Sequence, residues 1–291
     1  LAPREIDRAL AACLSTKRPV YIELPRDMVD RPCPAPTPWS QPPPRSDAKT
    51  LDEVLREASD MLRQARRPVI LAGVELHRFG LQSALLSLAR RTGYPIASTL
   101  LGKSVISEMH PQYLGVYEGA IGREDVQRAV ESADCVLNLG AFLTDIDMGI
   151  NTAKLDMART INATAERISI GYHHYEGVCL GDFIRRLASA KLGPCRPVKL
   201  PPKRLPGRFR VEAGRPITVK RFFERINSFL SDDSVVISDI GDSLFGAADL
   251  TIHKRTEFIS PAYYTSMGFA TPAALGVQLA RPDLRPIVFV G

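Results

Sequence analysis

The sequence is poor in cysteine and lacks long apolar runs. Its five cysteines are scattered and form no CxxC pair; they are Cys13, Cys33, Cys135, Cys179 and Cys195. A disulfide framework and a cysteine-ligated metal site are therefore not expected, and the scatter favours a reducing compartment, the cytoplasm. No stretch approaches the roughly 18 consecutive apolar residues of a membrane-spanning helix, so no membrane partner is predicted.

The two ends lack the features of a complete protein. The chain begins LAPREIDRAL, with no methionine and no apolar core of a signal peptide. It ends RPIVFVG, one glycine after a run, 287–290, that is typical of a buried parallel strand. In an open α/β sheet the loop after such a strand usually carries ligand residues. We therefore expect a fragment that is truncated at both ends.

The basic excess of the sequence is confined to one stretch. The chain has 38 Lys and Arg against 32 Asp and Glu, and nine of the basic residues lie between Pro194 and Arg221 beside a single acid, Glu212. This stretch is rich in proline and is not interleaved with aromatic residues, so we interpret it as a solvated linker and expect no nucleic-acid partner. An anionic partner or a neighbouring subunit is the alternative.

Two proline-rich stretches divide the chain. Residues 32–44 contain seven prolines and residues 194–208 contain five, a composition typical of extended connectors. The predicted pieces are 1–31, 46–193, a basic linker over 194–215, and 216–291. The first piece reads as one helix and one buried strand, PVYIELP over 19–25, which is too little for a core of its own.

The two larger pieces alternate helical and strand patterns. In 46–193 we predict strands over 68–73, 95–99, 134–141 and 167–171, between helices over 51–65, 81–88, 123–133 and 182–190. Residues 216–291 repeat the alternation, with strands over 234–239, 257–260 and 286–290. This order predicts doubly wound parallel α/β sheets: a complete Rossmann-like domain, then the first half of another.

Four motifs could carry chemistry, and each also has an ordinary structural interpretation. SDIGDSLFG (238–246) is either a strand end with a helix cap or an anion site at a helix N-terminus. YYTSMGFATPAALG (263–276) is either a tightly packed helix or a place where a ligand approaches closely. His173 and His174 are either an acid–base pair or, as we favour, a local loop. AGVELHRFG (72–80) lacks GxGxxG, which argues against dinucleotide binding, and Glu75 and Arg78 there can form an ordinary surface pair.

The motifs in their order resemble a known family. PVYIELPRDMV, PVILAG, GKSVISEMHPQYLGVYEG, ESADCVLNLGAFLTD, VISDIGDSLF, YYTSMGFATPAALG and VFVG resemble, over the whole chain, the thiamine-diphosphate-dependent 2-oxo acid decarboxylases, and most closely their pyruvate, indolepyruvate and phenylpyruvate branch. The resemblance implies that 1–31 ends the pyrimidine-binding domain, that 46–193 is the middle domain, and that 216–291 is the first half of the diphosphate-binding domain.

The resemblance also implies a set of cofactor-binding residues. The matching positions are Gly241, Asp242, Ser243, Thr265, Ser266, Met267 and Gly291. Met267 matches the residue that wedges between the two cofactor rings, and Thr265 the position whose carbonyl accepts a bond from the cofactor's amino group. Since a carboxylate repels a diphosphate, we expect Asp242 to cap its own helix instead. Gly291 matches the first glycine of the family's GDG motif.

The remaining functional groups of the family are expected outside this chain. The catalytic Glu and paired His would lie upstream of Leu1, and the Mg²⁺ ligands just after Gly291. The resemblance implies that a 2-oxo acid is decarboxylated to an aldehyde and CO₂ by a homodimer or homotetramer, and that this fragment alone is inactive. Two alternatives stay open: an acetolactate-synthase-like carboligase, and a non-catalytic α/β binding module.

Overall fold

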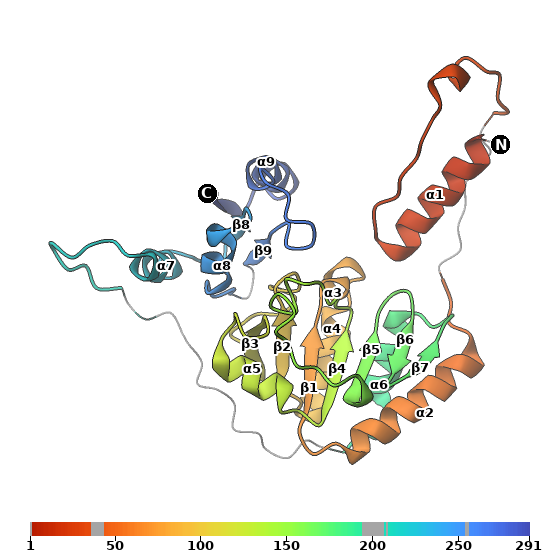
Figure 1. The fold of residues 1–291 in the computed structure, drawn as a ribbon, viewed down its shortest axis with the longest axis horizontal. Coiled ribbons are helices and arrows are strands. Elements are labelled where there is room, and N and C mark those ends of the chain that lie inside the picture. Colours follow the sequence, from red (N-terminus) through yellow and green to blue (C-terminus); the bar gives the residue numbers. More distant parts are fainter. Residues whose placement is uncertain (1, 36–43, 194–206, 208, 254–255) are drawn as a thin grey trace.

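The computed structural model describes residues 2–35, 44–193, 207, 209–253 and 256–291. These residues form a large and a small α/β unit that lie against each other, with an N-terminal helix beside them (Figure 1). Most of the predicted basic linker, and Cys195 with it, lies outside the described residues. The domain limits inferred from the proline-rich stretches remain predictions.

The large unit is built on a seven-stranded sheet in the order β3-β2-β1-β4-β5-β6-β7. The first five strands in this order run parallel, whereas β6 pairs antiparallel with both β5 and β7. The strands are β1 (Pro68–Ala72), β2 (Ile96–Thr99), β3 (Tyr113–Tyr117), β4 (Cys135–Leu139), β5 (Thr160–Ala163), β6 (Ile168–Ile170) and β7 (His173–Tyr175). The α/β class is confirmed, but the antiparallel edge and β3, β5 and β7 were not predicted.

Helices cover both faces of this sheet. α2 (Ala48–Gln64), α4 (Gln82–Thr92) and α6 (Leu180–Ser189) pack on one face, and α5 (Glu124–Glu131) packs on the other. The short helix α3 (Glu75–Arg78) follows β1. All five residues of β1 are buried between these two layers, which explains why that strand is apolar without interruption.

Local sequence sets the ends of these helices. The Asp47 carboxylate accepts a bond from the Thr50 amide and caps α2, whose buried side chains recur at helical spacing. α4 ends at Gly93, which adopts the left-handed conformation (φ 74°) that a helix C-terminus favours.

The small unit has three parallel strands in the order β10-β8-β9. They are β8 (Ser234–Ser238), β9 (Glu257–Ile259) and β10 (Arg285–Phe289). Buried side chains of the sheet pack against α7 (Val219–Asn227) and α8 (Asp242–Ala248) on one face and against α9 (Ala270–Ala280) on the other. The alternation predicted for 216–291 is confirmed.

The N-terminal segment differs from the prediction. α1 (Ala2–Thr16) forms as expected but buries no residue. Residues 19–25 are extended and exposed, with Tyr21 83% exposed, so the predicted buried strand is wrong. A strand needs a neighbour to satisfy its backbone groups, and no described strand lies beside this segment. After it comes a single 3₁₀ turn, η1 (Arg26–Met28).

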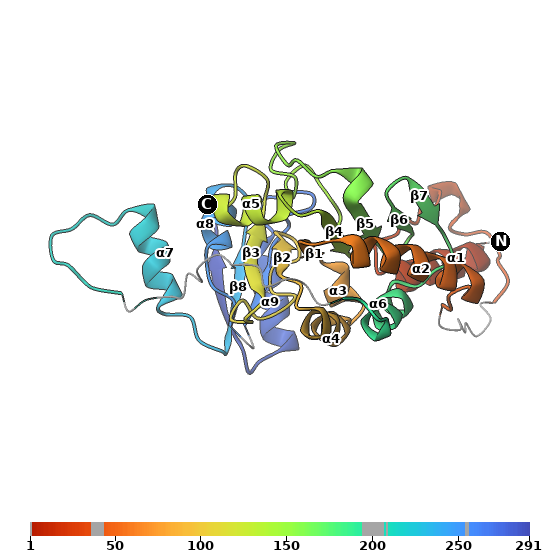
Figure 2. The same cartoon turned by 90° about the horizontal axis from the view of Figure 1, so that it is seen from below.

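The large and small units share a buried apolar cluster. Leu100 and Val116 of the large unit belong to the same buried cluster as Leu244, Ala247 and Phe258 of the small one. Seen from below, β3 and α5 lie beside α8 (Figure 2). Within the described residues, no helix is long and apolar enough to cross a membrane.

Candidate functional site

Three loops meet at the carboxyl edge of the small sheet. β8 leads into Gly241, Asp242 and Ser243; residues 265–267 precede α9; and Gly291 follows β10. β8 and β10 are parallel neighbours in which Ser238 pairs with Phe289, so the loops that follow them emerge side by side. The structure thus brings together every cofactor-binding residue inferred from the resemblance, at the edge where α/β sheets bind ligands.

Asp239 holds these loops together. Its Oδ2 accepts a bond from the Gly268 amide at 2.9 Å, and its own amide donates to the Phe289 carbonyl at 2.8 Å. Asp239 is buried. We did not predict this role, although an acid at the end of an apolar strand was a signal that could have suggested it.

Two glycines leave open space at the meeting point. Gly241 and Gly268 have φ angles of 80° and 78°, which L side chains rarely adopt, and a Cβ on either would meet no atom within 4 Å. A ligand can therefore come close to the backbone of both loops.

The start of α8 differs in detail from the expectation. The N-cap is Gly241, which has no side chain, and Asp242 is the first helical residue and makes no capping bond. Instead the Ser243 hydroxyl donates to the Ile240 carbonyl at 2.9 Å. The Ser243 Oγ also lies 3.8 Å from where a Cβ on Gly291 would stand. The expected capping by Asp242 is therefore wrong, and its side chain is exposed.

The loop before α9 presents apolar and aromatic side chains to solvent. Met267 is 85% exposed, and Tyr263 and Tyr264 are exposed as well. Thr265 has φ 57°, a strained conformation for a β-branched residue, and its amide donates to the Pro261 carbonyl at 2.8 Å. An exposed Met267 on a strained loop suits contact with a ligand; its wedge role remains a prediction.

An aromatic contact links this loop to the large unit. The Tyr263 ring lies edge-on to Phe142, with centroids 6.1 Å apart, and the Arg18 guanidinium lies 4.4 Å from the Phe142 centroid. Arg18 also pairs with Glu75. The N-terminal segment and the 263–268 loop therefore contact the same aromatic ring.

The other candidate residues have structural roles. His173 and His174 lie on β7, not in a loop, and bond separately to Glu57 and Ser169. They form no acid–base pair. Glu75 is fully buried, so the surface pair expected with Arg78 is wrong. Burial raises the pKa of the Glu75 carboxyl, and the hydrogen bond from the Ala165 amide lowers it by less.

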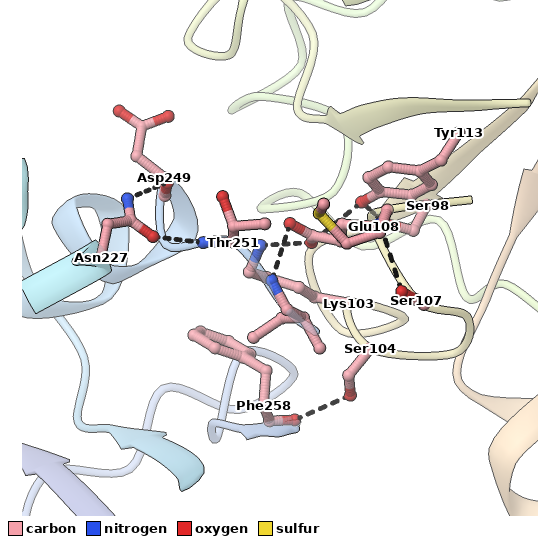
Figure 3. A network of polar contacts seen from close by, with 12 residues as sticks. Ser98, Lys103, Ser104, Ser107, Glu108, Tyr113, Asn227, Asp249, Thr251 and Phe258 are labelled. Atoms are coloured by element: carbon pink, nitrogen blue, oxygen red, sulfur yellow. Dashed lines mark hydrogen bonds and ion pairs between the residues drawn. The ribbon is translucent and has the colours of Figure 1, made fainter. Parts of the chain in front are cut away.

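A polar network joins the two units (Figure 3). Lys103, 1% exposed, donates to Glu108 Oε1 at 2.5 Å and lies 5.6 Å from the centroid of the Phe258 ring. Glu108 Oε1 also accepts from the Tyr113 hydroxyl, and Oε2 accepts from the Ile252 amide at 3.2 Å. The Glu108 amide in turn donates to the Ile252 carbonyl at 2.9 Å. Glu108 thus links the large unit to the small unit through hydrogen bonds.

Two buried acids beside this network were also missed from sequence. Burial raises the pKa of both Glu118 and Asp147 to about 7. The charge of Asp249 also raises the pKa of Glu118, and the charge of Glu118 raises that of Asp147. Asp147 Oδ1 accepts from the Leu100 amide at 3.1 Å. In the described part of the chain no group of three or more His, Cys, Asp and Glu side chains could hold a metal ion.

Comparison with known protein families places both units. Residues 55–187 match the family described as "Thiamine pyrophosphate enzyme, central domain". Residues 239–291 match "Thiamine pyrophosphate enzyme, C-terminal TPP binding domain". The second match contains the three loops described above.

Curated relatives match along the whole chain. Pyruvate decarboxylase isozyme 1 of Saccharomyces cerevisiae is 33% identical over 301 residues, which cover 100% of this chain and 53% of the relative. Indole-3-pyruvate decarboxylase of Azospirillum brasilense is 31% identical, with the same coverage, and alpha-keto-acid decarboxylase of Mycobacterium avium is 30% identical and covered to 52%.

The chain spans about half the length of these curated relatives. The two matched segments agree with the two sheets, and the loops at the carboxyl edge of the small sheet lie in the cofactor-binding match. With a central domain over 55–187 and a C-terminal TPP-binding domain over 239–291, the chain belongs to the thiamine pyrophosphate enzymes.

Proposed function

We propose that this chain supplies the middle domain and part of the diphosphate-binding domain of a thiamine-diphosphate-dependent 2-oxo acid decarboxylase. The reaction converts an aryl- or alkyl-pyruvate, such as indolepyruvate, phenylpyruvate or pyruvate, to an aldehyde and CO₂. One observation carries the proposal: Asp239 ties together the loops after β8 and before α9, next to the end of β10. The names of the relatives favour decarboxylation over carboligation.

The residues of these loops would hold the cofactor in distinct ways. Gly241 and Gly268 leave room for close approach to the backbone, and Ser243 offers a hydroxyl near Gly291. Met267 offers an exposed, polarizable side chain for ring contact, while Ser266 and the Thr265 carbonyl lie in the same loop. When bound, the cofactor supplies an electron sink for the pair left behind as CO₂ departs.

The resemblance extends the proposal to parts outside these loops. Mg²⁺ would be bound by residues after Gly291 and would offset the negative charge of the diphosphate. A catalytic Glu and paired His would come from a pyrimidine-binding domain before Leu1, in a homodimer or homotetramer in the cytoplasm. On this proposal the 291-residue chain binds the cofactor but has no decarboxylase activity of its own.

Calorimetric titration of the chain with thiamine diphosphate and Mg²⁺ tests the site. Wild-type chain is expected to bind thiamine diphosphate at least tenfold more tightly than thiamine, because the loops face the diphosphate. Gly268→Val is expected to abolish binding. Gly80→Val is the matched control, since Gly80 also has a positive φ (63°) and open space, but lies on the large unit.

Two results would contradict the proposal. Equal binding of thiamine and thiamine diphosphate would remove the diphosphate role of the loops. Equal loss of binding in Gly80→Val and Gly268→Val would show that backbone strain, not the site, is being measured. Separately, release of CO₂ from phenylpyruvate by the chain alone would refute the proposal that the chain is inactive by itself. The same result would support the proposed decarboxylase reaction.

A further inference from the structure

A cavity of about 360 Å³ lies between the two units, apart from the loops described above. One wall comes from β3 and the residues after it, including Glu118 and Arg123. The other comes from α8 and the residues that follow it, including Phe245 and Asp249. The volume is at the small end of the range for ligand pockets.

Most charges that line this cavity are already paired. Lys103 is bonded to Glu108 at 2.5 Å. Arg123 is held by Asp125 through Nε at 3.0 Å and NH2 at 2.6 Å. The charges within each pair cancel, so neither pair adds a net positive charge to the cavity.

The acids Glu118 and Asp249 are the exceptions. Glu118 is 8% exposed, its Oε1 is buried without a partner, and no hydrogen bond to its carboxylate is found among the described residues. Asp249 lines the same cavity, and its charge raises the pKa of Glu118, whereas the charge of Lys103 lowers it. The Asp147 carboxyl is a further acid that interacts with Glu118. Glu118 and Asp249 therefore both line the cavity, and no described cation forms an ion pair with either carboxylate.

Apolar side chains form part of the lining, beside the polar Tyr113 and Thr251. Val116 and Ile121 from the large unit and Phe245 and Ala248 from the small unit complete the wall. A buried carboxylate without a partner costs free energy that a cation with hydrogen-bond donors would recover. The apolar wall would accept a short hydrocarbon body on the same molecule.

We infer that this cavity binds a small organic cation: a primary ammonium group held by Glu118 and Asp249, with a short apolar body against Val116, Ile121, Phe245 and Ala248. Residues of both units line the site, so an occupant contacts both and favours their association. This site is separate from the loops proposed to bind the cofactor, and it does not depend on that proposal.

The test uses n-butylammonium chloride as the probe and the 291-residue chain as the receptor. Titration calorimetry at pH 8 is expected to show one saturable site with a Kd of about 1 mM or tighter. Butan-1-ol, which has a hydroxyl in place of the ammonium, is expected to bind at least tenfold more weakly. Lowering the pH from 8 to 6 is expected to weaken butylammonium binding about tenfold, since the pKa of Glu118 is raised to about 7 and its carboxylate becomes protonated.

Variants distinguish the cavity from general surface charge. Glu118→Gln is expected to weaken butylammonium at least tenfold, and Asp249→Asn to weaken it less, because Asp249 is exposed. Glu124→Gln, which removes an exposed carboxylate of α5 outside the cavity, is the matched control and is expected to leave binding unchanged. The inference is overturned if no saturable binding occurs, if butan-1-ol binds equally well, or if Glu118→Gln binds as tightly as Glu124→Gln.

Discussion

Glu108→Gln is expected to destabilise the chain strongly. The substitution keeps the shape of the side chain but removes its charge, so that the almost fully buried Lys103 ammonium loses its ion-pair partner. The two carboxylate oxygens of Glu108 accept hydrogen bonds from the Tyr113 hydroxyl and from the Ile252 amide. In glutamine one of these oxygens is replaced by an amide nitrogen, which cannot accept. The change therefore acts on the ion pair and on the contact between the two units together.

The size of the effect follows from the burial of the pair. Removing one partner of a buried ion pair costs about 3–5 kcal/mol, because the other charge stays buried without compensation. With a urea m-value of about 2 kcal/mol/M, this corresponds to a fall of about 1.5–2.5 M in the unfolding midpoint. Urea unfolding followed by circular dichroism measures the shift.

An exposed ion pair on α5 provides the control. Glu124 pairs with Arg128 at 3.7 Å and both side chains are exposed, so Glu124→Gln is expected to cost less than about 1 kcal/mol. Adding Lys103→Met to Glu108→Gln is expected to recover part of the loss, since no unpaired charge is then buried. A cost for Glu108→Gln as small as that for Glu124→Gln would refute the reasoning.

Three further predictions concern other parts of the fold. Burial raises the pKa of Asp147 to about 7, so the stability that its protonated form contributes is present at low pH and lost as pH rises through 7. Asp147→Asn is expected to flatten the fall in the urea unfolding midpoint between pH 5 and 8. An unchanged slope of midpoint against pH would contradict this expectation. Gly73→Ala would place a Cβ 2.1 Å from the Ala141 Cα and is expected to destabilise the large unit by about 1–3 kcal/mol or more, measured as a lower melting temperature; an unchanged temperature would be the opposing result. Phe142→Ala removes the ring that packs against Tyr263 and is expected to weaken binding of thiamine diphosphate about two- to tenfold in calorimetry, with no loss implying that the loop holds its position without this contact.

The strongly periodic elements could be read from the sequence. α2 has apolar side chains at helical spacing behind an Asp47 cap, and β1 is an uninterrupted apolar run, so local pattern alone predicts both. β3 and β7 were missed because their residues lack a clear strand pattern and are placed by pairing with β2 and β6. The strand expected over 19–25 failed for the converse reason: its composition suits a strand, but no described strand pairs with it.

The candidate site divides in the same way. The order of the motifs and the positions of Gly241, Gly268 and Met267 were present in the sequence, because loops with glycine at positive φ carry a local signature. The role of Asp239, which bonds to a residue 29 positions away, and the pairing of Lys103 with Glu108 beneath Ile252 could not be read there. Those contacts depend on which strands become neighbours.

The sequence by itself determined the α/β class, the glycine-rich loops and the family resemblance, because each rests on local pattern or on the order of motifs. Only the tertiary structure decided that the loops meet at one sheet edge, that no described residue bonds to the buried Glu118 Oε1, and that a cavity lies between the two units. The physical reason is that burial and the absence of a partner are properties of the surroundings, which segments distant in sequence supply.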